Sequence, residues 1–284
     1  MAKQDNFKVP CGFEYQKSPV DLAFASAVLF LMGSSEIIIK EDEGVAGLGS
    51  RRFKRKDFLL RVREFPVLFS SRGRDAGRGI VPVESNAFIV ERWHARTLFS
   101  PSIQLHIAPQ GAVSVLSVHD QLFYENNMTY RGCCSAQFLP EDLISDVVRE
   151  GKRFAEFFSE KGYRGHLSFN TIVLENGTLL FTEVNPRRVM SSYPFKIVQR
   201  CVTGVAVPPW YVSSRVQKDS WKGKDIAHVL RELSPSLFSK GSQRGIIPYD
   251  YGLLSSAGML SVLCIGSNKE EVKNLLSVCD VHLS

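Results

Sequence analysis

Residues 165–188 read GHLSFNTIVLENGTLLFTEVNPRR, and this stretch decides the fold class. Two apolar runs, residues 166–174 and 178–184, are separated by Glu175-Asn176-Gly177. An Asn-Gly pair between two apolar runs is a strong signal for a β-hairpin, because both residues accept the positive φ of a tight turn. The sequence therefore predicts two antiparallel strands here.

The second strand of this hairpin carries side chains that suit a magnesium ion. Glu183 and Asn185 lie two residues apart, so they face the same side of a strand, and Arg187 follows them. Centring the turn on the Asn-Gly pair places Asn170 near Glu183 on the neighbouring strand. Mg²⁺ prefers oxygen ligands and shares them with phosphates. The alternative is a half-exposed strand carboxylate that pairs with Arg187 or Arg188.

A second group of residues suits phosphates. Lys40 ends a β-branched strand predicted at residues 36–40, and a loop with Gly44, Gly47 and Gly49 follows it. Glycines let backbone N–H groups approach phosphate oxygens, and a lysine neutralises phosphate charge. The spacing is not that of the Walker motif. A plain flexible turn is the alternative interpretation.

A third group, Val90-Glu91-Arg92-Trp93, closes a buried strand predicted at residues 87–92. The Glu91 carboxylate can accept a hydrogen bond from an adenine amino group, while the backbone groups of Arg92 and Trp93 lie where they can read the ring edge. The alternative is an ordinary strand end.

The remaining pattern predicts an alternation of helices and strands. Ser18 and Pro19 have the residue types of an N-cap and a first helical position, and Gly33 is placed to end that helix. Further helices are predicted at residues 141–161, 224–233 and 269–279, and further strands at residues 103–108, 112–118 and 259–265. The sum is an α+β fold whose antiparallel sheets carry helices.

Composition limits the class of protein. The chain has 284 residues, 44% of them hydrophobic, and a net charge of +6, which favours anionic partners. The most apolar early stretch, residues 22–32, spans about 16 Å as a helix and is too short for a bilayer core of about 30 Å. We expect a cytoplasmic protein with reduced cysteines that does not enter membranes. A basic segment, residues 51–63, is an amphipathic surface or, less favoured, a nucleic-acid-binding patch.

In this order, the three groups resemble the ATP-grasp superfamily of carboxylate–amine ligases. The spacing of Asn170 and Glu183 resembles that of D-alanine–D-alanine ligases, and residues 185–192 are similar to carbamoyl-phosphate synthetase. The resemblance covers residues 7–204, and the tail from Met259 more weakly resembles the closing subdomain of pheganomycin-type peptide ligases. It implies two α+β lobes with antiparallel sheets that grip ATP: a phosphate-loop lobe at residues 1–92, and a lobe with the metal site and closing subdomain at residues 93–284.

The resemblance also implies a reaction. A carboxylate substrate attacks the γ-phosphate of Mg²⁺-bound ATP, which gives an acyl phosphate and ADP, and an amine then displaces phosphate. Lys40, with Lys8 as a second lysine, would contact ATP. Arg187 would neutralise charge on the acyl phosphate, and Arg131, expected in a loop before the long helix, would contact the substrate or the γ-phosphate.

Two departures from the family keep alternatives open. Asn170 occupies a position that usually holds aspartate, so a catalytically degenerate ATP-binding module that acts as a regulatory or partner subunit is the competing hypothesis. The N-terminal domain usual in the family does not precede Lys8. Either that domain is absent, or a homo-oligomer or second chain supplies it, or the chain is a piece of a longer protein.

Overall fold

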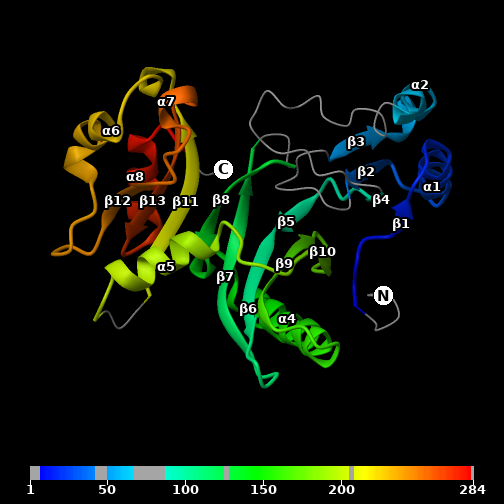
Figure 1. Cartoon of the computed structure of the whole chain (residues 1–284), viewed down its shortest axis with the longest axis horizontal. Helices are drawn as coiled ribbons and strands as arrows, with labels where there is room; N and C mark the ends of the chain where they lie inside the picture. Colours follow the sequence, from blue (N-terminus) through cyan, green and yellow to red (C-terminus); the bar gives the residue numbers. More distant parts are fainter. Residues whose placement is uncertain (1–6, 42–49, 67–86, 125–127, 205–207, 283–284) are drawn as a thin grey trace. The chain divides into compact units, whose positions relative to one another are not determined.

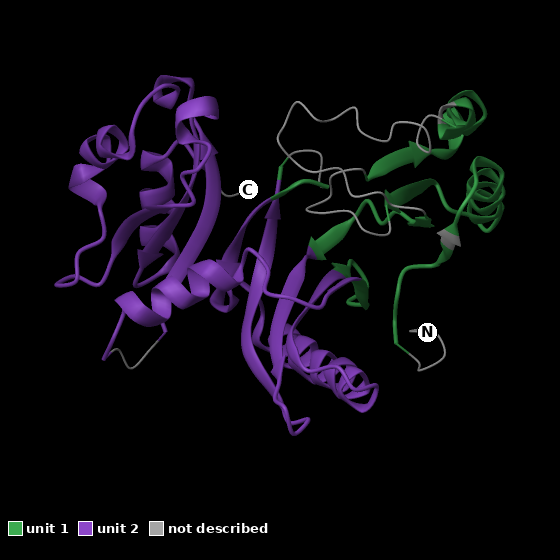
Figure 2. Ribbon diagram, in the orientation of Figure 1, with its two compact units in different colours: residues 1–98, 124–130, 173–182 green, residues 99–123, 131–172, 183–284 purple. Residues whose placement is uncertain are grey.

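The structure is a computed structural model that describes residues 7–41, 50–66, 87–124, 128–204 and 208–282 (Figure 1). The chain forms two compact units (Figure 2). Unit 1 comprises residues 1–98, 124–130 and 173–182, and unit 2 comprises residues 99–123, 131–172 and 183–284. The tip of the 165–188 hairpin is thus part of unit 1, whereas the predicted division at residue 92 follows the chain linearly.

Unit 1 is built on an antiparallel sheet with four strands among the described residues. Their order is β1 (Gly12–Gln16), β4 (Phe88–Arg92), β2 (Glu36–Glu41) and β3 (Arg51–Lys54). Helices α1 (Pro19–Leu31) and α2 (Phe58–Arg61) share one apolar core with this sheet. Ile37 and Ile39 point into that core, so the alternation of β2 places Lys40 on the face opposite the helices.

The predicted start of α1 is confirmed. The Ser18 Oγ accepts a hydrogen bond from the Asp21 backbone N–H at 3.1 Å, and Pro19 occupies the first turn. Gly33 follows the helix with a φ of +88°, a conformation that favours glycine. Short 3-10 turns flank α2 at Arg55–Asp57 and Val62–Glu64.

A second sheet, most of which belongs to unit 2, has nine strands in the described ranges. The order is β10 (Leu179–Asn185), β9 (Gly165–Leu174), β6 (Pro101–Ile107), β7 (Val113–Phe123), β8 (Tyr130–Ser135), β11 (Trp210–Gln217), β13 (Met259–Gly266) and β12 (Gly245–Tyr249), with β5 (Thr97–Phe99) beside β9. The predicted hairpins at 103–118 and 165–185 are both present. The α+β class is confirmed.

Helices cover this sheet. The long helix α4 (Glu141–Glu160) packs on β6 and β9, where the rings of Phe154 and Phe169 lie 5.0 Å apart. The shorter helices are α5 (Ser192–Cys201), α6 (Ile226–Glu232), α7 (Leu254–Ala257) and α8 (Lys269–Val278). Cys264 of β13 belongs to the α8 side of the core, and Ile265 belongs to the α5 side. β13 is therefore an interior strand of the sheet, and the tail from Met259 is integrated into unit 2.

Two further observations concern the described residues of both units. None of the six cysteines, all within the described ranges, forms a disulfide. In the same ranges, no helix has both the length and the apolar character that a bilayer-spanning segment needs.

Candidate active site

Lys40 and Glu91 lie together in unit 1. Lys40 Nζ is 2.5 Å from Glu91 Oε2, and it also donates to the backbone carbonyl of Thr182 at 3.3 Å. Glu91 pairs with Ile38 in the β2–β4 register, so Lys40 is its diagonal neighbour. An ammonium has three N–H donors. Two of those on Lys40 are thus engaged by groups of the described residues, and the third can donate to a further acceptor such as a phosphate oxygen.

The backbone after Glu91 differs in part from the expectation that its polar groups contact the edge of an adenine ring. The backbone N–H of Arg92 donates to the Cys11 carbonyl, and that of Trp93 donates to the Glu36 carbonyl. These two N–H groups serve the sheet and are not available to an adenine ring. The Arg92 side chain donates to Ser34 Oγ at 3.0 Å and so braces the turn after α1.

The indole of Trp93 offers a different group at this place. Its buried Nε1 and the buried Nε2 of His94 find no hydrogen-bond partner in the described part of the chain. The Arg52 guanidinium lies 5.1 Å from the indole centroid and forms an ion pair with Glu36. Burial and the nearby Arg92 charge lower the pKa of His94, so its ring is neutral near pH 7. A buried donor without a partner is costly, so these atoms are candidate ligand contacts.

Two other predicted nucleotide contacts have less structural support. Lys8 is tied to β10 through its backbone carbonyl, which accepts from Phe181 N–H at 2.9 Å, and its side chain is exposed. Gly44, Gly47 and Gly49 lie outside the described residues.

In unit 2 the side chains of Asn170 and Glu183 meet, as the sequence predicts, but the turn differs from the expected one: the Leu174 N–H donates to the Thr178 carbonyl, so the loop comprises Glu175, Asn176 and Gly177. Asn170 Nδ2 donates to Glu183 Oε2 at 2.5 Å, from one strand to the next. The Glu183 carboxylate is exposed and forms no ion pair within the described ranges. A half turn of the amide would exchange nitrogen for oxygen and present two oxygen ligands to a cation.

Asn185 and Arg187 follow in the same segment. Asn185 is buried, and its backbone carbonyl accepts from the Arg187 N–H at 2.8 Å. The Arg187 side chain is exposed, with Nη1 3.4 Å from the Arg188 carbonyl. The structure thus places the two predicted metal ligands Glu183 and Asn185 in different environments, one exposed and one buried.

Arg131 lies on strand β8, and the expectation of a loop is wrong. β6 and β7 separate β8 from β9 in the sheet. Three strand spacings correspond to about 14 Å, which is longer than an arginine side chain. Arg131 is therefore not beside the Asn170–Glu183 pair.

The donor set has limited charge for a metal ion. No group of three or more His, Cys, Asp or Glu side chains in the described part of the chain is arranged to hold a metal. Glu183 supplies one carboxylate, and Asn170 and Asn185 supply amides. This set suits Mg²⁺, which keeps several waters and shares its remaining positions with phosphates.

A buried polar network next to this segment escaped the sequence analysis. Gln104 Nε2 donates to Ser191 Oγ at 2.6 Å and lies 3.2 Å from His119 Nδ1, while Gln104 Oε1 accepts from Ser192 Oγ at 2.9 Å. Ser192 Oγ also accepts from the Val189 N–H. Gln104 thereby ties β6 to the chain that follows Arg187.

The donor and acceptor of each hydrogen bond in this network can be assigned. Ser192 donates its hydroxyl proton to Gln104 Oε1, so the Gln104 amide nitrogen faces His119. Burial lowers the pKa of His119 to about 3, so the ring is neutral and its Nδ1 accepts. Its Nε2 then carries the proton and donates to Tyr211 Oη at 2.6 Å. Gln104 and His119 lie in one predicted hairpin, but Ser191, Ser192 and Tyr211 join them only through contacts between distant parts of the chain, which no local sequence signal predicts.

Comparisons with known proteins agree with the fold. No protein-family model matches the chain. A curated relative, the L-propargylglycine–L-glutamate ligase of Streptantibioticus cattleyicolor, is 26% identical over 200 residues. That match covers 64% of this chain and 40% of the relative, so the chain spans less than half of that protein.

Solved structures give the wider match. An ADP complex of N5-carboxyaminoimidazole ribonucleotide synthetase superposes with a TM-score of 0.66 at 15% identity, over 98% of this chain and 69% of the other. The Campylobacter jejuni biotin carboxylase gives a TM-score of 0.65 at 13% identity, over 98% of this chain and 63% of the other. Both neighbours are ATP-grasp proteins. The chain therefore has the ATP-grasp fold.

Proposed function

We propose that the protein is an ATP-dependent ligase that forms ADP, an acyl phosphate and then an amide bond. The observation that carries this proposal is the contact between Asn170 and Glu183, which presents an exposed carboxylate immediately before Asn185-Pro-Arg187. The fold supports it, because several neighbours of this fold are structures with ADP or an ATP analogue.

ATP and Mg²⁺ are the cofactors that this proposal requires. The remaining N–H of Lys40 would bind a phosphate oxygen, and Glu91 would hold the ammonium in place. Glu183 and the amides of Asn170 and Asn185 would bind Mg²⁺, which neutralises phosphate charge when bound. Phosphoryl transfer depends mainly on such positioning and charge stabilisation.

The proposed reaction has two chemical steps. A carboxylate oxygen forms a bond to the γ-phosphorus, and the bond from that phosphorus to the ADP oxygen breaks. An amine nitrogen then attacks the acyl carbon, inorganic phosphate leaves, and the nitrogen loses one proton. The exposed guanidinium of Arg187 would stabilise negative charge on the acyl phosphate and on the oxyanion that follows.

The curated relative supports an amino-acid substrate, because its name gives two amino acids as the compounds that it joins. We infer that this protein joins a small carboxylic acid, such as an amino acid, to an amine. Hydroxylamine is a suitable general probe, because it converts an acyl phosphate to a hydroxamate that can be measured without knowledge of the natural amine.

The test is ADP release and hydroxamate formation with pools of amino acids, Mg²⁺ and hydroxylamine. The wild type should form both products in equal amounts, and Glu183→Gln should lower the rate at least about 100-fold, since one oxyanion- or metal-type contact is worth 10²–10³ in kcat. Glu175→Gln is the matched control, because Glu175 lies in the same hairpin and its one ion pair within the described residues is an exposed one with Arg96. Full activity of Glu183→Gln would refute the proposed role of Glu183.

A degenerate ATP-binding module is the second candidate, favoured by the amide of Asn170 in place of a carboxylate. It predicts that an ATP analogue binds in the presence of Mg²⁺ but that no acid pool yields ADP or hydroxamate. A gain of ADP formation in Asn170→Asp, with none in the wild type, would establish this second candidate.

A further inference from the structure

Helix α1 exposes an apolar side that nothing in the described structure covers. Val20, Phe24 and Leu31 have exposed fractions of 76%, 72% and 81%. They are spaced by four and seven residues, so they share one side of the helix. The opposite side, with Leu22 and Leu29, is fully buried in the unit 1 core. A helix that is apolar on both sides normally has partners on both sides.

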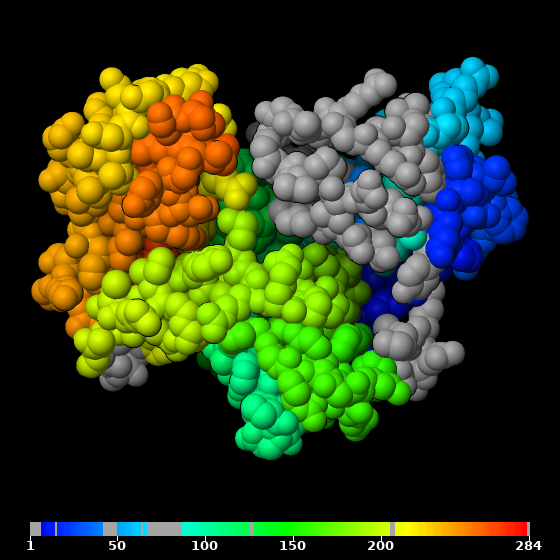
Figure 3. Space-filling model, in the orientation of Figure 1, coloured from blue at the N-terminus to red at the C-terminus, as the bar shows by residue number. Residues whose placement is uncertain are grey.

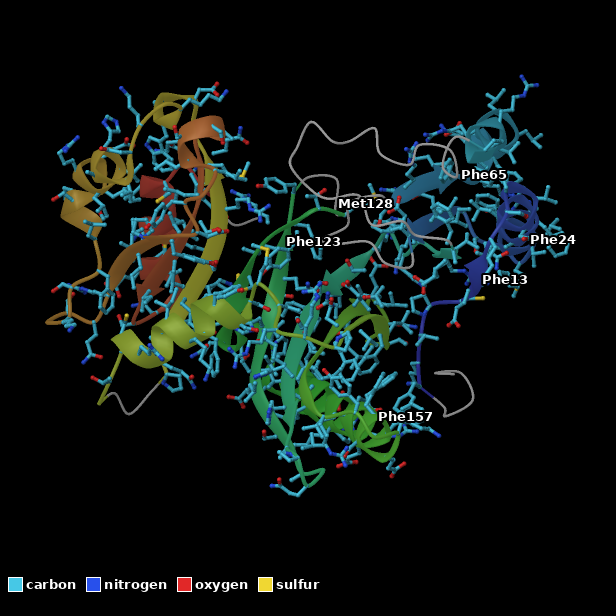
Figure 4. The ribbon with its side chains drawn as sticks, viewed as in Figure 1. Phe13, Phe24, Phe65, Phe123, Met128 and Phe157 are labelled. Atoms are coloured by element: carbon cyan, nitrogen blue, oxygen red, sulfur yellow. The ribbon has the colours of Figure 1, made fainter. Side chains whose placement is uncertain are left out.

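The exposed apolar surface continues onto α2. Leu59 and Leu60 are 80% and 75% exposed. The rings of Phe30 and Phe58 lie 5.1 Å apart and join the two helices. In Figure 3 the blue α1 and the lighter blue segment of α2 adjoin on the surface of unit 1, and in Figure 4 Phe24 projects outward from α1.

A basic hollow lies between the end of α1 and the start of α2. Its volume is about 610 Å³, and its lining residues are Gly33, Ser34, Ser35, Glu36, Lys54, Arg55 and Lys56. The Glu36 carboxylate is paired with Arg52, which lowers its pKa, so Glu36 is ionised but neutralised. The three exposed cations therefore give the hollow a positive potential, and its lining residues come from the segments that directly follow α1 and precede α2 in the chain.

The same segment holds most of the net charge of the protein. Residues 50–66 contain seven cations against two acids, a surplus of five, whereas the whole chain has a net charge of +6. The seven cations are Arg51, Arg52, Lys54, Arg55, Lys56, Arg61 and Arg63, and the acids are Asp57 and Glu64. Arg52 pairs with Glu36, which lies outside this range, so the local surplus is four, and a segment with this charge attracts an anionic partner.

We propose that this surface, the outer side of α1 with α2 and the basic hollow, docks on an anionic phospholipid bilayer. A lipid phosphate would lie in the hollow, against Lys54, Arg55 and Lys56, while Phe24 and Leu31 enter the boundary between headgroups and acyl chains. Apolar side chains next to cations are the combination by which peripheral helices bind such membranes. The inference is independent of the proposed ligase activity. It departs from the expectation that the protein does not enter membranes, which rests on the short length of the apolar segment, because docking at the headgroup boundary needs no segment that spans the bilayer.

Two other classes of partner each account for only one of the two properties of this surface, its positive charge or its exposed apolar side chains. A nucleic acid would use the cations but leave the five large apolar side chains in water. A second copy of the chain would cover the apolar side but bring a second surplus of positive charge to the same surface. Only an anionic apolar interface uses both properties.

Vesicle co-sedimentation tests the proposal. The wild type should bind phosphatidylcholine vesicles that contain about 30 mol% phosphatidylglycerol at least ten times more tightly than pure phosphatidylcholine vesicles, since each basic residue near an anionic surface adds to the attraction. The triple variant Lys54→Gln/Arg55→Gln/Lys56→Gln should lose this binding at least tenfold. Its matched control is Lys224→Gln/Arg231→Gln/Lys240→Gln, which removes three exposed cations of the same types from unit 2.

The apolar contribution needs its own variant. Phe24→Ser/Leu31→Ser should weaken binding to anionic vesicles at least tenfold, while Leu253→Ser, an exposed apolar residue of unit 2, should not change it. Thermal unfolding confirms that each variant is folded, and a folded result is expected because all changed side chains are exposed. The proposal is overturned if the wild type shows no preference for anionic vesicles. It is also overturned if either variant binds like its control, or if light scattering shows a dimer without vesicle binding.

Discussion

Gln104 is the residue whose contacts most directly support the loop that contains Arg187. It donates to Ser191, accepts from Ser192 and contacts His119, all in a buried environment. Gln104→Ala leaves these groups without partners, so we expect the free energy of unfolding to fall by about 2–4 kcal/mol. Urea denaturation measures this loss. Gln137→Ala, which removes contacts only to the Pro208 and Pro209 carbonyls, is the control and should cost less than about 1 kcal/mol.

The neighbours His119 and Asp120 have opposite effects on the pH dependence of stability. Burial raises the pKa of Asp120 to about 6. The contribution of this carboxyl to the free energy of unfolding is therefore present at low pH and is lost as the pH rises through 6. Burial lowers the pKa of His119 to about 3. The contribution of this ring to the free energy of unfolding is therefore present above the ordinary histidine pKa of about 6.5 and is lost as the pH falls below it. Between about pH 4 and 6 the two slopes oppose each other.

Asp120→Asn separates these two effects. The amide keeps an oxygen that can accept from the Ser100 N–H, but it does not titrate. Relative to the wild type, the free energy of unfolding of the variant should therefore rise between about pH 4 and 6, by an amount on the order of 2 kcal/mol. Chemical denaturation at a series of pH values measures the difference. A difference that stays constant over this range would contradict the raised pKa of Asp120.

At the scale of the elements, the β9–β10 hairpin and the β8–β11 pair respond differently to an added methyl group. Gly177 has a φ of +78° and open space around its Cβ position, so Gly177→Ala should cost only the backbone strain of about 1 kcal/mol. A Cβ at Gly132 would lie 2.0 Å from the Ser213 carbonyl oxygen of β11. Gly132→Ala should therefore cost about 2–3 kcal/mol and disturb the pairing of these strands. Thermal unfolding of both variants compares the two costs, and equal costs would contradict the close approach at Gly132.

The elements that the sequence predicts are those with local signals. The Asn-Gly pair marks the hairpin that brings Asn170 to Glu183, and Ser18 with Pro19 sets the start of α1. Strands β8 and β11 have no such signal, because residues far apart in the sequence determine their pairing, as in Val212 with Cys134. This is why Arg131 was expected in a loop.

In the candidate site, too, only the contacts with a local sequence signal could be predicted. The contact between Asn170 and Glu183 follows from one hairpin, whereas Lys40 and Glu91 are 51 residues apart and meet only through the β2–β4 register. The sequence identifies these two as separate ligands but not as an ion pair. The unpartnered indole N–H of Trp93 likewise depends on how the β4 end packs, which no local pattern predicts.

At the scale of the whole molecule, charge and candidate ligands are unevenly distributed. Most of the net positive charge belongs to residues 50–66 of unit 1. Lys40 and Glu91 also belong to unit 1, whereas Asn170, Glu183 and Asn185 belong to unit 2. The proposed function assigns nucleotide contacts to the residues of unit 1 and metal contacts to those of unit 2. Substitutions in the two sets should therefore affect nucleotide binding differently.

Calorimetric titration with a non-hydrolysable ATP analogue, with and without Mg²⁺, tests the central claim most directly. In the wild type we expect Mg²⁺ to tighten binding at least tenfold, about 1.4 kcal/mol. Glu183→Gln should lose this effect of Mg²⁺ but keep the Mg²⁺-free affinity, and Glu175→Gln should keep both. An undiminished effect of Mg²⁺ in Glu183→Gln, or no binding of the analogue by the wild type, would contradict the account.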